Sequence, residues 1–392
     1  HYLALGQAYL SVAASIERLQ ASAASGVEAT KATAGALDDR VNGNREEQKE
    51  RNRIIRQAIH ILEEACRLAP EQAASWLALV EAQRAGGFLE RAAESAQRAI
   101  DLSPEEVRPR VLRAEIALEI GDAPKALEHI TTALRLEDAT KEMTVDDNLQ
   151  ASLLLIRILR QLGRPVEAMR ALETAIPRFS QPLPLLLERI HLIREIHGAK
   201  AATEALKQLA EQYPNQPEVL GPLAFALSEE DQPESAIRAA QSALQSMSHE
   251  SATPKPTLPG DQAVDPARLH ALLGSLLSQA GQLDGAIHHF NEAIRMAPFL
   301  LEPYLELGHA LLARRQYTQA LQIYNQAMRI SPHDPRPYYQ AGLALKDSKD
   351  YLGAESMLRR ASALTPQDLN IHRQLGAVVA LNLVHNRAAV RR

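Results

Sequence analysis

The sequence predicts an all-α solenoid, a chain of paired helices stacked side by side, and two observations carry this prediction. Pro298, Pro332 and Pro366 recur at an interval of 34 residues, and a fixed period of that length indicates a repeat array. Within each half of the period, apolar residues recur every three or four positions, the spacing that places side chains along one stripe of a helix. Each unit is therefore expected to hold two amphipathic helices.

The three units that span residues 267–368 share further positions. The first half of each unit carries a large residue and, four positions later, a glycine: His270 and Gly274, Tyr304 and Gly308, Tyr338 and Gly342. The second half carries a small–large–small series: Ala286, Phe290 and Ala293; Ala320, Tyr324 and Ala327; Ala354, Leu358 and Ala361. Glycine inside a helix costs about 0.5–1 kcal/mol relative to alanine. Its recurrence predicts that the two helices of a unit approach closely there, and the proline then stops the second helix.

This 34-residue pattern resembles the tetratricopeptide repeat, and the stretch from Leu305 to Pro332 matches nearly every signature position. The resemblance implies a right-handed α-solenoid of about nine helix-turn-helix repeats plus a C-terminal capping helix. It also implies that the first helices of successive repeats line a concave inner face, where proteins of this family usually bind their partners.

At the N-terminal end, the first unit is predicted to be split by an insertion. Residues 1–14 fit a first helix, whereas the second-helix pattern of Ala58, Leu62, Ala65 and Pro70 comes roughly forty residues later than the period requires. The insertion, at about 15–52, contains the charged run 45–51. We expect a flexible or partly helical excursion that runs into a long second helix, and a solvated loop is favoured over a binding role.

The middle of the chain carries weaker copies of the unit. The period resumes with Trp76 and Pro104, and the next copy, at 107–140, has Arg110 in place of the large residue and Asp138 in place of proline. Further units lead to residue 250. A Pro-rich polar stretch at 251–266 is expected to be a loop. The expected organisation is an N-terminal array at 1–250, this loop, and a C-terminal array of three strong repeats and a terminal helix at 267–392.

Composition narrows the class of protein. The formal net charge of −5 and the pI near 6.3 give no reason to expect nucleic acid as a partner. No apolar run approaches the roughly 20 residues of a membrane span. The single cysteine, Cys66, allows no intrachain disulfide. Its spacing from the neighbouring apolar residues predicts that it lies on the buried face of a helix. Because the chain begins at His1 inside a helical pattern, the N-terminus of the native protein is not visible, a signal peptide or domain could precede it, and a cytoplasmic location is only favoured.

The sequence carries no recognisable catalytic motif. Phosphate-binding loops, dinucleotide fingerprints and nucleophile elbows are all missing from it. His288 and His289 are adjacent and would point about 100° apart on a helix, so they are not expected to bind one metal ion from one face. We expect a non-enzyme with no catalytic residues, no metal site and no cofactor.

The family resemblance also assigns candidate contact residues, by their register in the first helices. These partner-binding candidates are Arg157, Arg160, His191, Arg194, Glu302, Leu305, His309, Arg336 and Tyr339. Three of them, Arg157, Arg160 and Arg194, would form a basic patch suited to acidic side chains or a terminal carboxylate. Scattered, solvated arginines are an equally open interpretation.

Related repeats that bind the acidic C-terminus of heat-shock chaperones use a set of lysine, arginine and asparagine residues at defined positions. In the three strong repeats these positions hold Ala271, Ser275, Glu306, Arg336 and Gln340. Only Arg336 has a suitable charge, and Glu306 would repel a carboxylate. The sequence therefore does not predict this partner.

The favoured hypothesis is a protein–protein interaction scaffold that binds a peptide or helix of a partner in its concave groove. One alternative is a regulatory or substrate-docking arm of an enzyme or larger assembly whose catalytic domain lies outside these residues. Another is a self-association module, in which a second copy covers an exposed terminal repeat. The sequence identifies neither the partner nor the pathway.

Overall fold

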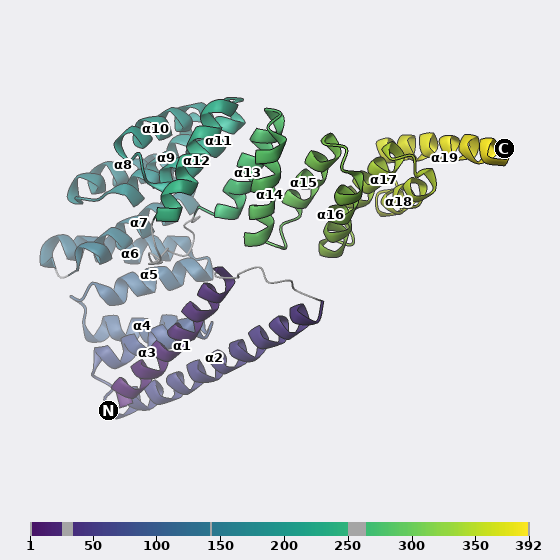
Figure 1. Ribbon diagram of the computed structural model, residues 1–392. Coiled ribbons are helices and arrows are strands. Elements are labelled where there is room, and N and C mark those ends of the chain that lie inside the picture. The colour runs from purple at the N-terminus through teal and green to yellow at the C-terminus, as the bar shows by residue number, and fades with distance from the viewer. Residues whose placement is uncertain (1, 26–33, 142, 250–263, 391–392) are drawn as a thin grey trace. The chain divides into compact units, whose positions relative to one another are not determined.

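The computed structural model describes residues 2–25, 34–141, 143–249 and 264–390. Over these residues the chain is all-α, with nineteen α-helices and one short 3-10 helix (Figure 1). The predicted fold class, an all-α solenoid, is confirmed. The chain divides into two compact units, which we call unit 1 (His1–Ala202) and unit 2 (Thr203–Arg392).

Helix bounds follow the repeat pattern in both units. Unit 1 contains α1 (Tyr2–Ser25), α2 (Ala34–Leu68), α3 (Ala73–Ala85), α4 (Leu89–Leu102), α5 (Arg108–Ile120), α6 (Ala123–Thr140), α7 (Val145–Gln161), α8 (Pro165–Ala175), η1 (Ile176–Arg178) and α9 (Leu183–His197). The boundary between the units falls within α10 (Ala199–Gln212). Unit 2 continues with α11 (Pro217–Glu229), α12 (Pro233–His249), α13 (Pro266–Gln279), α14 (Leu283–Met296), α15 (Leu301–Ala313), α16 (Tyr317–Ile330), α17 (Pro335–Asp347), α18 (Tyr351–Leu364) and α19 (Leu369–Val390).

Within each unit, the first helices of successive repeats form a row. From α1 to α9 and from α11 to α19, each helix packs against the next in the sequence. The further contacts skip one helix and join odd-numbered helices, such as α5 to α7, α7 to α9 and α15 to α17. We call these first-helix rows, and define them as α1, α3, α5, α7 and α9 in unit 1 and α11, α13, α15 and α17 in unit 2.

The close approach of the two helices in a repeat is confirmed at the glycines. A Cβ placed on Gly274 would lie 2.7 Å from the Phe290 ring, and one on Gly342 would lie 2.7 Å from Leu358 Cγ. The Tyr324 ring fills the equivalent space beside Gly308. The alanines that flank these large residues are fully buried. A small residue on the first helix therefore makes room for a large residue on the second.

The order of sizes is reversed in the repeat formed by α3 and α4. There Val80 occupies the register of the glycine and Ala96 that of the large residue, and both are completely buried in one core cluster. The repeat therefore keeps the combined volume of the pair while exchanging its members, a kind of swap that cores tolerate well.

The first repeat pairs α1 with the second half of α2. A Cβ on Gly6 of α1 would lie 2.5 Å from Leu62 Cγ of α2, so these helices pair as first and second helices despite the insertion. Residues 15–25 and 34–52 are helical, which agrees with the expected partly helical excursion into a long second helix and not with a loop over those residues. Residues 26–33 lie outside the described part of the chain.

Recurrent hydrogen bonds join one repeat to the next. Trp76 Nε1 donates to the Pro70 carbonyl oxygen (2.8 Å), Tyr304 Oη to that of Pro298 (3.0 Å) and Tyr338 Oη to that of Pro332 (3.2 Å). In each case the donor stands near the start of a first helix, six residues after the proline. The large residue of the repeat thus has a polar tip that satisfies a carbonyl left unpaired beyond the preceding helix.

The turn between the two helices of a repeat contains one residue with a left-handed backbone conformation. Gly121, Gly163 and Gly281 have φ of 91°, 67° and 75°, and Arg315 and Lys349 take the same register with φ of 61° and 69°. Glycine adopts this conformation without the steric cost that other residues incur. The packing of the repeat therefore imposes this left-handed conformation even on Arg315 and Lys349, which adopt it less readily than glycine does.

Three further expectations concern the cysteine, membrane-spanning helices and the Pro-rich loop. Cys66 is buried and free, and burial raises the pKa of its thiol to about 11, so the predicted core role is confirmed. None of the helices in the described ranges is long and apolar enough to cross a membrane. Residues 251–263 of the predicted Pro-rich loop lie outside those ranges, and the division at 1–250, 251–266 and 267–392 stays a prediction.

Candidate functional site

In unit 1, ion pairs tie neighbouring first helices together. Arg84 of α3 contacts both Glu115 and Glu119 of α5. Two repeats further on, Arg160 of α7 contacts Glu188 (2.9 Å) and Glu195 (2.5 Å) of α9. Both arginines hydrogen-bond a glutamate 35 residues later, which shows that the same register positions are used. The ties thus join α3 to α5 and α7 to α9.

Both arginines are only partly exposed, at 27% for the Arg84 side chain and 29% for Arg160. Burial by itself would lower the pKa of each guanidinium, but the two carboxylates beside each one outweigh it, and the pKa rises above its ordinary value. A half-buried guanidinium between two carboxylates is positioned more rigidly than an exposed pair. The ties are thus suited to holding the row in one arrangement.

A similar link appears in unit 2. Lys346 Nζ of α17 donates to Gln374 Oε1 of α19 at 3.1 Å, and its spacing of 28 residues equals that between Arg160 and Glu188. Arg336 contacts Asp334 at 2.7 Å and Glu302 of α15 at 3.5 Å. The structure therefore brings two candidates, Glu302 and Arg336, together, with each partly neutralising the other.

The partner-binding candidates of unit 1 differ in exposure and in the contacts that they already make. Arg160 is occupied by its two glutamates. Arg157, half-buried on α7, makes no hydrogen bond or ion pair with any residue that the structure describes. His191 and Arg194 are exposed on α9, and His191 occupies the same register on α9 as Arg157 does on α7. The basic patch is thus reduced by the compensation of Arg160.

In unit 2 two candidates belong mainly to the packing. Leu305 is 7% exposed and so offers little surface to a partner, contrary to the expectation. Tyr339 is half-buried and packs on a cluster formed by Ala354, Leu358 and Val378. His309 is half-buried, with its ring edge-on to Tyr324 and its Nδ1 4.0 Å from Glu306.

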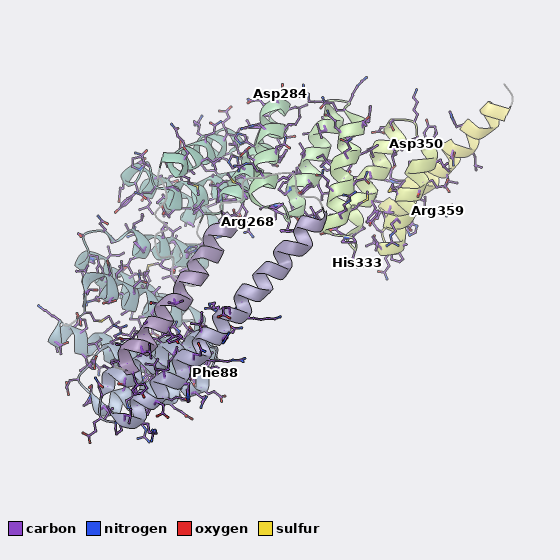
Figure 2. The ribbon with its side chains drawn as sticks, turned by 60° about the horizontal axis from the view of Figure 1, so that its bottom comes forward. Phe88, Arg268, Asp284, His333, Asp350 and Arg359 are labelled. Carbon is purple, nitrogen blue, oxygen red and sulfur yellow. The ribbon has the colours of Figure 1, made fainter. Side chains whose placement is uncertain are left out.

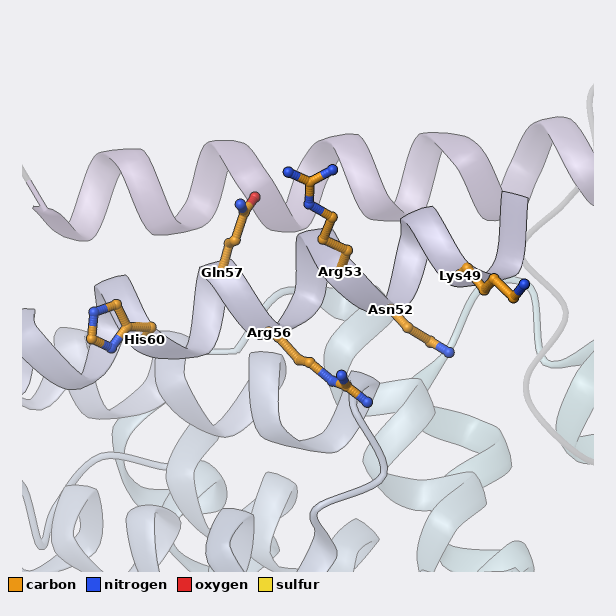
Figure 3. A pocket seen from close by; sticks show the side chains of 6 residues that line it. All are labelled: Lys49, Asn52, Arg53, Arg56, Gln57 and His60. Atoms are coloured by element: carbon orange, nitrogen blue, oxygen red, sulfur yellow. The ribbon is translucent and has the colours of Figure 1, made fainter. Parts of the chain in front are cut away.

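A feature that the sequence interpretation missed is a cationic hollow on the exposed side of α2. It has a volume of about 470 Å³ and is lined by Lys49, Asn52, Arg53, Arg56, Gln57 and His60 (Figure 3). Arg53 lies 3.7 Å from Glu50. The spacing of these residues along one helical stripe is visible in the sequence, but only Lys49 and Asn52 lie within the insertion predicted at about 15–52, and the others follow it.

The histidines form a pair that the sequence did not indicate. His289 of α14 meets His270 of α13, with their Nδ1 atoms 2.9 Å apart, while His288 lies edge-on to His289. Burial lowers the pKa of both, to about 4 for His289. In the part of the chain that the structure describes, no group of three or more potential ligands could hold a metal ion.

Side chains at the ends of helices in unit 2 are mostly engaged locally. Asp350, labelled in Figure 2, caps α18 by accepting a hydrogen bond from the Gly353 amide at 3.0 Å. Arg359, labelled nearby, pairs with Glu355 of the same helix at 2.7 Å. Such caps and pairs stabilise helices and need no ligand to explain them.

Paired helices, buried small–large contacts and two rows of first helices define a helical repeat protein built as an α-solenoid. Family models described as tetratricopeptide repeat match residues 49–107, 111–182 and 267–299, and one described as TPR repeat matches residues 308–348. Together they cover just over half of the chain. The chain belongs to the tetratricopeptide repeat family. Its repeats are those of a protein-interaction scaffold.

Solved structures are similar to parts of the chain at low sequence identity. No curated protein matches the chain. A crystal structure of MamA protein is 18% identical, with 48% of this chain and 94% of that chain covered and a TM-score of 0.42. A tetratricopeptide repeat protein from Parabacteroides merdae is 17% identical, with coverages of 70% and 98% and a TM-score of 0.40. Pseudomonas aeruginosa PilF is 18% identical, with coverages of 60% and 98% and a TM-score of 0.45.

Proposed function

We propose that this protein is a non-enzymatic scaffold that binds an acidic peptide or helix of a partner protein on the first-helix row of unit 1. The observation that carries the proposal is the state of Arg157. This half-buried cation has no partner among the described residues, on a row whose neighbouring cations Arg84 and Arg160 are each held by two carboxylates.

The physical argument rests on preorganisation and charge. Ion pairs that already join α3 to α5 and α7 to α9 reduce the ordering that a partner must impose on binding, and a surface ordered in advance favours affinity. An acidic side chain or terminal carboxylate that meets Arg157 would form a charge-assisted, bidentate contact. The exposed His191 at the same register of α9 extends the contact to the next repeat.

The test is affinity capture from the source organism's lysate with three forms of the protein: the wild type, Arg157→Glu and Arg170→Glu. Arg170 is exposed on α8, a second helix, so its reversal makes the same change in net charge away from the row. We expect a partner that the wild type and Arg170→Glu retain and that Arg157→Glu loses.

Circular dichroism on the three forms would establish that each keeps its helical content. Equal retention of the same partners by all three would refute the role of Arg157. Equal loss from both variants would show that the partner responds to net charge and not to the first-helix row.

A further inference from the structure

The repeat formed by α5 and α6 carries arginines at positions where the other repeats carry apolar or aromatic residues. Arg110 stands 34 residues after Trp76 and takes the register of the large residue near the start of a first helix. Arg113 stands 34 residues after Leu79, which is 3% exposed. The equivalent residues of unit 2 are also buried: Leu273, Leu307 and Ala341. Departures of this kind from a repeated pattern are expected at functional sites.

Arg113 lacks a counter-charge among the described residues. Its side chain is half-buried, its Nε atom is shielded from solvent, and it makes no hydrogen bond or ion pair there. Arg110 is also half-buried, and the contact it makes in the described part of the chain is a hydrogen bond to the Glu106 carbonyl oxygen at 3.3 Å. A buried donor without an acceptor costs free energy, and a charged donor costs more. The two guanidiniums therefore have donors to spare for an anion.

A histidine of α6 joins the two arginines. His129 has the register of His289, and Arg110 has that of His270. In unit 2 these two positions bring ring nitrogens within 2.9 Å of each other. Register therefore places His129 beside Arg110, and Arg113 lies about one turn further along α5. In agreement, burial and then the charges of Arg113 and Arg110 lower the pKa of half-buried His129. Three donor side chains from two helices thus gather at one place.

Two carboxylates act on this group, but neither pairs with it. Glu128 raises the pKa of His129, yet it is exposed and forms no ion pair with either arginine. Asp122 is engaged at the start of α6, where it accepts a hydrogen bond from the Lys125 amide at 3.2 Å and pairs with Lys125 Nζ at 2.7 Å. We call Arg110, Arg113 and His129 the α5–α6 cationic cluster.

We propose that the α5–α6 cationic cluster binds a phosphate group. A phosphate group carries about 1.5–2 negative charges at pH 7, and its oxygens point in several directions. It can therefore accept hydrogen bonds from two guanidiniums and an imidazole N–H at once. A carboxylate has two oxygens in one plane, which a single arginine can occupy. The proposal is independent of the role proposed for Arg157.

The experiment compares melting temperatures of the whole protein in chloride and in inorganic phosphate at equal ionic strength, followed by circular dichroism. Arg113→Leu restores the residue of the neighbouring repeat and should melt at or above the wild-type temperature in chloride. The wild type should gain at least about 2 °C more from phosphate than Arg113→Leu does, because a ligand that binds only the folded state stabilises it. Arg135→Leu removes the same charge from an exposed position of α6 and should gain as much as the wild type.

Equal gains in the wild type and Arg113→Leu would overturn the proposal. Equal reductions of the gain in Arg113→Leu and Arg135→Leu would also overturn it, because they would trace the effect to net charge. Arg113→Lys separates binding from folding, since it keeps the positive charge but not the planar fork of donors. It should melt like the wild type in chloride and lose at least half of the gain from phosphate.

Two further anions identify the ligand chemistry. The same gain from acetate as from phosphate would assign the cluster to carboxylates and contradict the proposal. Phosphoserine blocked at both ends distinguishes the two sources of a phosphate group. A larger gain from blocked phosphoserine than from inorganic phosphate would support a phosphorylated side chain of a partner protein, and a smaller gain would support free phosphate.

Discussion

Gly308 shows at the scale of a single residue how closely the two helices of a repeat approach. The Tyr324 ring occupies the space that a Cβ would need, and Tyr324 is completely buried, so it has no room to withdraw. Gly308→Ala should lower the free energy of unfolding by about 1–3 kcal/mol, as overpacking of a core typically does. Chemical denaturation followed by circular dichroism measures this change.

The matched control is Gly376→Ala, the same substitution at the same register without a neighbour. There the better helix propensity of alanine should stabilise α19 by roughly 0.5–1 kcal/mol. Equal effects of the two substitutions would contradict the close approach at Gly308.

At the same scale, the sequence predicted which residues are buried better than it predicted the contacts that these residues make. The alignment of glycines and alanines was sufficient to predict buried small residues. It did not predict that Tyr304 and Tyr338 donate to proline carbonyls, because the acceptor becomes apparent only when the turn geometry is known. Leu305 was assigned to the binding face by register alone, although an apolar side chain at that position packs inward and is 7% exposed.

At the scale of elements, the α13–α14 pair should be sensitive to acid. Burial holds the pKa of His270 and His289 below the ordinary value, to about 4 for His289. His288 and Arg295 act on the pair in the same direction, whereas Glu292 opposes them. Because the folded state favours neutral rings, their contribution to stability is complete above about pH 6.5 and is lost as the pH falls toward 4.

Melting temperatures at pH 7.5 and 5 test this expectation. His289→Gln should show a smaller drop between the two conditions than the wild type does. His333→Gln, which changes an exposed histidine in the turn before α17 (Figure 2), should behave like the wild type. If the drop were the same in all three proteins, the histidine pair would not be the acid-sensitive element.

The helices at the insertion were predicted only in part. Residues 34–52 contain Gly35, Gly43 and a charged run, which together suggest a loop. The helix forms nonetheless because its second half is fixed by the burial of Ile55, Ala58 and Leu62, and a helix extends readily from a nucleus that already exists. Glutamate, lysine, arginine and glutamine are also good helix formers.

At the scale of the whole molecule, the all-α repeat architecture followed from the 34-residue period, whereas the charge pattern of the candidate site did not. The basic patch was predicted from the arginines of two neighbouring first helices, and the glutamates of those helices were left out. The acidic partners of Arg160, Glu188 and Glu195, lie 28 and 35 residues later, on the next first helix. Such spacings are those of adjacent repeats, so a search at the repeat period could have found the pairs.

The measurement that most directly tests the central claim, that partners bind on the first-helix row of unit 1, is site-specific photo-crosslinking. A photoreactive amino acid would replace His191 on α9 or, as the control, Arg170 on α8, both of which are exposed. Irradiation in lysate followed by mass spectrometry should show a partner crosslinked from position 191 and not from position 170. Crosslinks from position 170 alone would place the partner on the second helices and contradict the claim.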